Sequence, residues 1–242
     1  MKHIEFVGPP GSGKSTIHEC VVSQSRYYGG TATDAYQRQF GDQVGKIPAG
    51  VLAILPDPVQ LRLENTILKH RFRQRSITQF MSQYPEFIEA IGAAIDAAEH
   101  DSETLSKRML QMMSRYQLGS DTTHDDELLC IDEGITHRAV GFLHRGAEFD
   151  VDNYLKTGPK PSAIVYVTAP VNVCLDRQED RGSVVAGKPW HDSEEECQEY
   201  YHSYFDDVVG RQRERTTVLK INNTGSVDEA TKRVTEQLDH VL

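Results

Sequence analysis

Short apolar runs alternate with amphipathic segments along much of the chain. Four runs have the length and the β-branched content of strands, namely 2–7 (KHIEFV), 128–131 (LLCI), 162–169 (SAIVYVTA) and 216–222 (TTVLKIN). Each is followed by a segment with helical spacing of its apolar residues, at 15–27, 136–144, 171–181 and 226–241. Strands that alternate with helices predict right-handed β-α-β units, and therefore an α/β fold with ligands at the carboxyl ends of parallel strands.

The middle of the chain has a different pattern. Residues 41–58 are rich in glycine and proline and predict a loop, whereas residues 59–118 predict three successive helices. Residues 27–34 (YYGGTATD) predict a second strand that ends near Asp34. We therefore expect a single domain over residues 1–242, with a mostly parallel five-stranded sheet between two helical layers and a helical insertion at 59–118.

Composition narrows the range of partners. The 242 residues carry a formal net charge of −10, which argues against a nucleic-acid polymer because phosphate backbones need a basic surface. No apolar run approaches the roughly 20 residues that cross a bilayer, and the first eight residues do not resemble a signal peptide, so we expect a cytoplasmic protein with no membrane partner. The four cysteines are widely spaced, which favours thiols over a disulfide framework or a zinc site.

Residues 8–15 fit the pattern G-x-x-x-x-G-K-[ST] between a predicted strand and a predicted helix. The backbone N–H groups of such a loop wrap the phosphates of a nucleotide at the positive end of a helix. We expect Lys14 to reach the β- and γ-phosphates and the hydroxyl of Ser15 to bind Mg²⁺. The predicted nucleotide-binding residues of this loop are Gly8, Pro9, Pro10, Gly11, Ser12, Gly13, Lys14, Ser15 and Thr16.

The segment GPPGSGKST resembles the loop of P-loop small-molecule kinases, in particular the thymidylate-kinase-like nucleoside and nucleotide kinases. It is also similar to the loops of ring-forming ATPases. The resemblance implies a three-layer P-loop fold that uses ATP and Mg²⁺, and residues 34–126 add no specific motif to it.

Two acids follow the apolar run at 128–131. The resemblance to P-loop proteins implies that Asp132 holds Mg²⁺ and contributes to catalysis. Glu133 has three interpretations: it activates water in an ATPase, it positions the acceptor in a kinase together with Arg138, or it caps the following helix. Arg138 stands six residues after Asp132, whereas the related kinases place an arginine directly after the acid.

Arg177 and Arg181 lie four residues apart on one face of a predicted helix, after a strand and a turn with Pro170. This arrangement is similar to the [DE]-R-x-x-x-R helix that leads into the lid of small-molecule kinases. The resemblance implies that both arginines stabilise the charge of the transferring phosphoryl group and that residues 182–196 form the lid. The alternative is an exposed helical face on which neighbouring acids pair with the arginines.

Two further regions complete the predicted site. Residues 222–229 (NNTGSVDE) are similar to the loop that packs on adenine in thymidylate and related kinases, which implies roles for Asn222, Gly225 and Ser226; Ser226 can equally cap the last helix. The helical insertion occupies the position of the acceptor-binding helices of such kinases. Its Arg71 and Arg75, together with Asp34, are candidates for binding the acceptor, although a solvated helical face explains the arginines as well.

Three functions fit these motifs. The first is transfer of the γ-phosphoryl group of ATP to a nucleoside or nucleoside monophosphate. The second is an ATPase or switch that couples hydrolysis to a partner, but the sequence has neither an LSGGQ-like segment nor an N-K-x-D motif. The third is phosphorylation of a non-nucleotide hydroxyl, such as that of a sugar or an antibiotic, on the same fold. The order of the motifs favours the first function.

Overall fold

A computed structural model describes residues 2–24, 26–29, 69–183 and 190–241. Its strands form one parallel sheet in the order β2-β3-β1-β4-β5. The strands are β1 (His3–Val7), β2 (Tyr27–Tyr28), β3 (Leu128–Asp132), β4 (Ala163–Thr168) and β5 (Thr217–Asn222). The predicted α/β fold with a five-stranded parallel sheet is confirmed.

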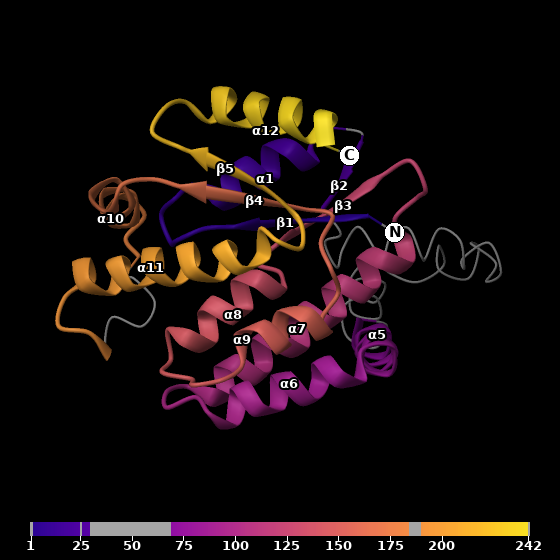
Figure 1. Cartoon of the computed structure of the whole chain (residues 1–242). Helices are drawn as coiled ribbons and strands as arrows, with labels where there is room; N and C mark the ends of the chain where they lie inside the picture. The colour runs from indigo at the N-terminus through magenta and orange to yellow at the C-terminus, as the bar shows by residue number, and fades with distance from the viewer. Residues whose placement is uncertain (1, 25, 30–68, 184–189, 242) are drawn as a thin grey trace, which may run out of the picture.

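Helices cover both faces of the sheet (Figure 1). Alternate side chains of each strand point to opposite faces, so that Ile4 and Phe6 join one core cluster and Val7 joins the other. The first cluster lies under α1 (Lys14–Val22) and α12 (Val227–Val241). The second lies under α5 (Lys69–Gln83), α6 (Pro85–Asp96), α7 (Ser102–Thr122), α8 (Ile135–Leu143), α9 (Val151–Thr157) and α11 (Glu194–Gln212), while α10 (Val171–Asp180) follows β4.

The predicted helices of the insertion are present as α5, α6 and α7, the second of which begins at Pro85 as expected. The predicted loop at 41–58 and the predicted end of the second strand at Asp34 lie outside the described residues. The limits of the insertion (59–118) and of the lid (182–196) stay predictions. Helix α9 was not predicted, because its seven residues are too few to show a helical period; the Asp150 side chain caps it by accepting a hydrogen bond from the Asn153 N–H at 2.9 Å.

None of the helices in the described part of the chain combines the length and the hydropathy needed to cross a membrane.

Glu5 places a carboxyl group in the middle of β1 with no solvent exposure. Its two oxygens accept hydrogen bonds from the backbone N–H groups of Ile135 (2.8 Å) and Thr136 (3.0 Å), in the first turn of α8. Gly134 makes this approach possible, since a Cβ at that position would stand 2.5 Å from Glu5 Oε1. Burial raises the pKa of Glu5 above its usual value. The strand that leads into the phosphate loop thus supplies the cap of α8.

The substitution Glu5→Gln should lower the free energy of unfolding by about 2 kcal/mol, because the amide offers one acceptor oxygen to two buried N–H groups. The matched control is Glu19→Gln on the exposed side of α1, which should change stability by less than about 0.5 kcal/mol. Urea unfolding of both variants measures the difference. Equal stability of the two variants would show that the buried carboxyl group does not hold α8.

Candidate nucleotide-binding site

The phosphate loop connects the end of β1 to the start of α1, as the motif predicts. Gly11 and Gly13 have φ angles of 80° and 87°, which L-residues with a side chain rarely adopt. Neither position has room for a Cβ. At Gly11 it would stand 2.2 Å from the carbonyl oxygen of Cys174, and at Gly13 it would stand 2.2 Å from Nδ2 of Asn223. Both glycines are therefore required by the loop's conformation and by its close contact with neighbouring elements.

The register of the sheet brings Asp132 to this loop. Strands β1 and β3 are neighbours, with Phe6 opposite Asp132. Lys14 Nζ lies 2.5 Å from Asp132 Oδ1, and the Ser15 hydroxyl donates to Asp132 Oδ2 at 2.9 Å. Burial by itself would raise the pKa of Asp132, but the charge and hydrogen bond of Lys14 outweigh burial and lower it. Asp132 is therefore ionised at neutral pH.

Ser15 and Asp132 have the spacing that a magnesium ion requires. Two neighbouring ligands of an octahedral ion with bonds of about 2.0–2.1 Å lie about 2.9 Å apart. Ser15 Oγ and Asp132 Oδ2 are separated by this distance. The donor set, a hydroxyl and an ionised carboxylate, also suits a hard cation. The residues present thus fit Mg²⁺, and their role as its ligands stays a prediction.

Glu133 has a φ angle of 59°, one of two positive values among the described residues other than glycine. Its carboxylate accepts a hydrogen bond from Arg138 Nη2 at 2.9 Å and lies 3.9 Å from Lys14 Nζ. Gly134 occupies the N-cap of α8, so the helix-capping interpretation of Glu133 is wrong. Burial raises the pKa of Glu133, but the charges of His137, Lys14 and Arg138 outweigh it and bring this pKa to about 2.

Arg177 lies against the phosphate loop from the side of α10. Its Nη1 donates to the carbonyl oxygens of Gly11 and Ser12 at 3.3 Å each, and its Nη2 donates to the carbonyl oxygen of Asn223 at 3.0 Å. Arg181 is the C-cap residue of α10 and is exposed. The two arginines therefore occupy different environments, although their spacing predicts one face. Their roles in stabilising the phosphoryl group stay predictions.

The loop after β5 contacts the phosphate loop through a residue that the sequence did not single out. Asn223 is buried, and its Nδ2 donates to the carbonyl oxygen of Ser12 at 2.8 Å. The predicted residues Asn222, Gly225 and Ser226 are exposed. The Ser226 hydroxyl accepts from the Glu229 N–H at 3.3 Å, as a capping residue does. Contact of this loop with adenine stays a prediction.

A second residue without a sequence signal is Gln198 of α11. It has no solvent exposure, its Nε2 donates to the carbonyl oxygen of Pro10 at 2.8 Å, and its Oε1 accepts from Gln178 at 3.4 Å. Such a contact joins residues 188 positions apart, and no local spacing could have predicted it.

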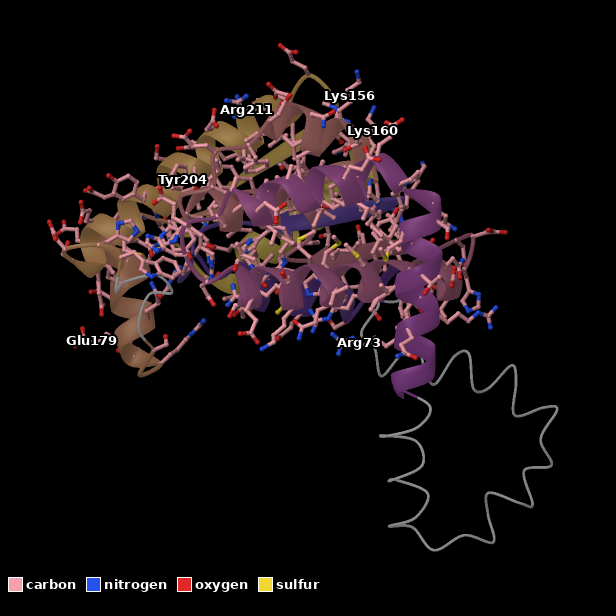
Figure 2. The ribbon with its side chains drawn as sticks, turned by 90° about the horizontal axis from the view of Figure 1, so that it is seen from below. Arg73, Lys156, Lys160, Glu179, Tyr204 and Arg211 are labelled. Atoms are coloured by element: carbon pink, nitrogen blue, oxygen red, sulfur yellow. The ribbon has the colours of Figure 1, made fainter. Side chains whose placement is uncertain are left out.

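The predicted acceptor side is described only in part. Asp34 and the side chain of Arg71 lie outside the described residues. Arg75 is exposed on α5, as is Arg73, which is labelled in Figure 2. Six of the predicted lid residues, 184–189, also lie outside the described part.

No family model matches the chain, and no curated protein matches it. Two solved structures of deoxyadenosine kinase from M. mycoides are similar to it over the full length of both chains. One has dCMP and a flexible dCDP bound, with a TM-score of 0.51 and 12% identity. The other has dCTP bound, with a TM-score of 0.50 and 12% identity. At this identity the likeness concerns the fold alone, which is an α/β fold like that of these two structures.

The substitution Arg177→Ala should weaken ATP binding by about tenfold or more, because three hydrogen bonds to the carbonyl groups of the loop and of Asn223 are lost. Arg181→Ala should leave ATP affinity within about twofold, since this exposed residue lies outside the loop. Equilibrium titration with ATP measures both values, and the melting temperatures of the variants exclude global unfolding. Equal ATP affinities of the two variants would contradict the role of Arg177 in holding the phosphate loop in place.

Proposed function

We propose that the protein is a phosphotransferase that moves the γ-phosphoryl group of ATP, with Mg²⁺, to a nucleoside or a nucleoside monophosphate. One observation carries the proposal: Lys14 and Ser15 of the phosphate loop converge on Asp132, at 2.5 Å and 2.9 Å. A cation, a hydroxyl and an ionised acid at the end of a parallel strand are the groups that bind and polarise a nucleotide triphosphate. The nucleoside-kinase fold supports a nucleoside-type acceptor.

Different residues serve ATP binding and phosphoryl transfer in this proposal. The N–H groups of the loop and the Lys14 ammonium bind the β- and γ-phosphates, and Lys14 exchanges the carboxylate of Asp132 for phosphate oxygens when ATP binds. Ser15 and Asp132 would hold Mg²⁺, which neutralises charge on the phosphates. Arg177 holds the loop in place through the carbonyl oxygens of Gly11 and Ser12. Arg181 supplies a further cation to the transferring group.

The environment of Glu133 favours transfer over hydrolysis. A catalytic base works best with a pKa near the operating pH, whereas the cations around Glu133 lower its pKa below the usual value. Its carboxylate is also engaged by Arg138 at 2.9 Å. Glu133 is therefore a weak acceptor of a proton from water. A fixed carboxylate–guanidinium pair instead offers hydrogen-bonding groups that position a polar acceptor.

The experiment is an acceptor panel of nucleosides, nucleoside monophosphates and sugars, followed by ADP release and by the mass of the product. ADP release should rise strongly with one nucleoside or nucleoside monophosphate, and the product should gain one phosphoryl group. Fast ADP release without any acceptor would contradict the proposal and favour an ATPase. Phosphorylation of a sugar alone would assign the protein to kinases of non-nucleotide hydroxyls.

Lys14→Ala should lower kcat/KM by at least about 100-fold with the preferred acceptor, because it removes the cation that stabilises the transferring charge. Lys156→Ala is the matched control, since Lys156 is exposed on α9, as Figure 2 shows, and should leave kcat/KM unchanged. Activity of Lys14→Ala equal to that of the control would refute the assignment of the phosphate loop.

A further inference from the structure

Three potential metal ligands lie together outside the nucleotide site. His144 is the C-cap residue of α8, Cys197 lies in the first turn of α11, and His191 precedes that helix. One ligand atom of each lies within 4.8 Å of the others. Among the described residues, this is the only group of three potential metal ligands so close together. No local spacing predicts this group, because the residues are separated by up to 53 positions.

The positions of the two imidazoles are fixed by the aromatic side chains of α11. His144 stacks on Tyr201 with ring centroids 3.8 Å apart and an angle of 12°, and its side chain is buried, with a residue exposure of 4%. His191 stacks on Tyr200 at 4.9 Å. His191 Nε2 is a buried nitrogen that has no hydrogen-bond partner among the described residues. A buried polar atom of this kind calls for a ligand.

The distances suit a tetrahedral ion. Bonds of about 2.0 Å to nitrogen and 2.3 Å to sulfur place neighbouring nitrogen and sulfur ligands about 3.5 Å apart. His144 Nε2 and Cys197 Sγ are 3.4 Å apart. A shift of His191 by roughly 1 Å brings the third ligand to the same spacing. We propose that His144, His191 and Cys197 form a binding site for a transition-metal ion of the zinc type, distinct from the magnesium site at the phosphate loop.

The chemistry of the three ligands is that of a zinc site. Two imidazoles and one thiolate are preferred by Zn²⁺, whereas Mg²⁺ prefers oxygen ligands. A neutral imidazole offers a nitrogen lone pair to the ion, and a cysteine binds it as the thiolate. Binding therefore releases the thiol proton of Cys197 to solvent as the S–metal bond forms.

A cavity of about 320 Å³ adjoins the two histidines and leaves room for a fourth ligand. His100, Asp192 and Glu196 also line it, together with Tyr204, which is labelled in Figure 2. A water molecule or one of these side chains would be the fourth ligand of the ion. The bound ion would connect the end of α8, the segment before α11 and the first turn of α11, and it would stabilise the folded chain against unfolding.

The test uses the full chain, freed of metal by a chelator and titrated with Co²⁺ and Zn²⁺ without nucleotide. Cobalt should bind once per chain and give the thiolate-to-cobalt charge-transfer band and visible d–d bands of tetrahedral coordination. Zn²⁺ should displace it and raise the melting temperature. The band reports binding at the cluster, because the predicted magnesium site has no sulfur ligand. Its absence would therefore overturn the proposal.

Variants assign the ligands. Cys197→Ser should lose the charge-transfer band, and His191→Ala should bind Zn²⁺ at least about 100-fold more weakly, since even indirect partners of a metal contribute 10–100-fold. Cys20→Ser and His124→Ala are the controls outside the cluster, and Asp132→Asn tests the magnesium site; all three should keep the band and the affinity. A band that survives in Cys197→Ser, or equal Zn²⁺ affinity in His191→Ala and its His124→Ala control, would show that the cluster is only packed side chains.

Discussion

The pairing of β1 with β3 is the constraint on which the candidate nucleotide site depends. With Phe6 opposite Asp132, the acid at the end of β3 lies beside the loop that leaves β1. Lys14 and Ser15 then reach its two oxygens at 2.5 Å and 2.9 Å. A slip of one residue would turn the side chain of Asp132 to the other face of the sheet. The chemistry of the site is therefore a consequence of strand register, which the two hydrophobic clusters on either face determine.

The same register also holds the polar side chains around the candidate nucleotide site in place. Glu5, one residue before Phe6, points to the opposite face and caps α8 through Ile135 and Thr136. Helix α8 in turn places Arg138 on Glu133 at 2.9 Å. The C-cap residue of the same helix is His144, in the proposed metal cluster. One short helix, fixed by a buried carboxyl group, thus contributes to both candidate sites.

The sequence predicted the parts of the molecule that are encoded locally. Buried parallel strands are continuous apolar runs, and the phosphate loop has a fixed spacing, so the sheet and the loop were recognisable. Contacts between distant segments were not recognisable. Gln198 reaches Pro10 from α11, and the wide cysteine spacing argued against a zinc site, whereas the fold brings His144, His191 and Cys197 together. After β5 the resemblance to thymidylate and related kinases pointed to Asn222, whereas the neighbouring Asn223 is the buried residue that donates a hydrogen bond to the carbonyl oxygen of Ser12. A motif locates such a loop, but only packing decides which of two adjacent amides faces inward.

A structure of the protein with Mg²⁺ and a non-hydrolysable ATP analogue tests whether the phosphate loop and Asp132 form the nucleotide site. We expect the Lys14 ammonium to leave Asp132 for β- and γ-phosphate oxygens, and Mg²⁺ to be held by the Ser15 hydroxyl and by Asp132 directly or through water. Arg177 should keep its contacts with Gly11 and Ser12. A triphosphate bound away from the loop, or a magnesium ion that neither Ser15 nor Asp132 contacts, would show that the nucleotide site is elsewhere.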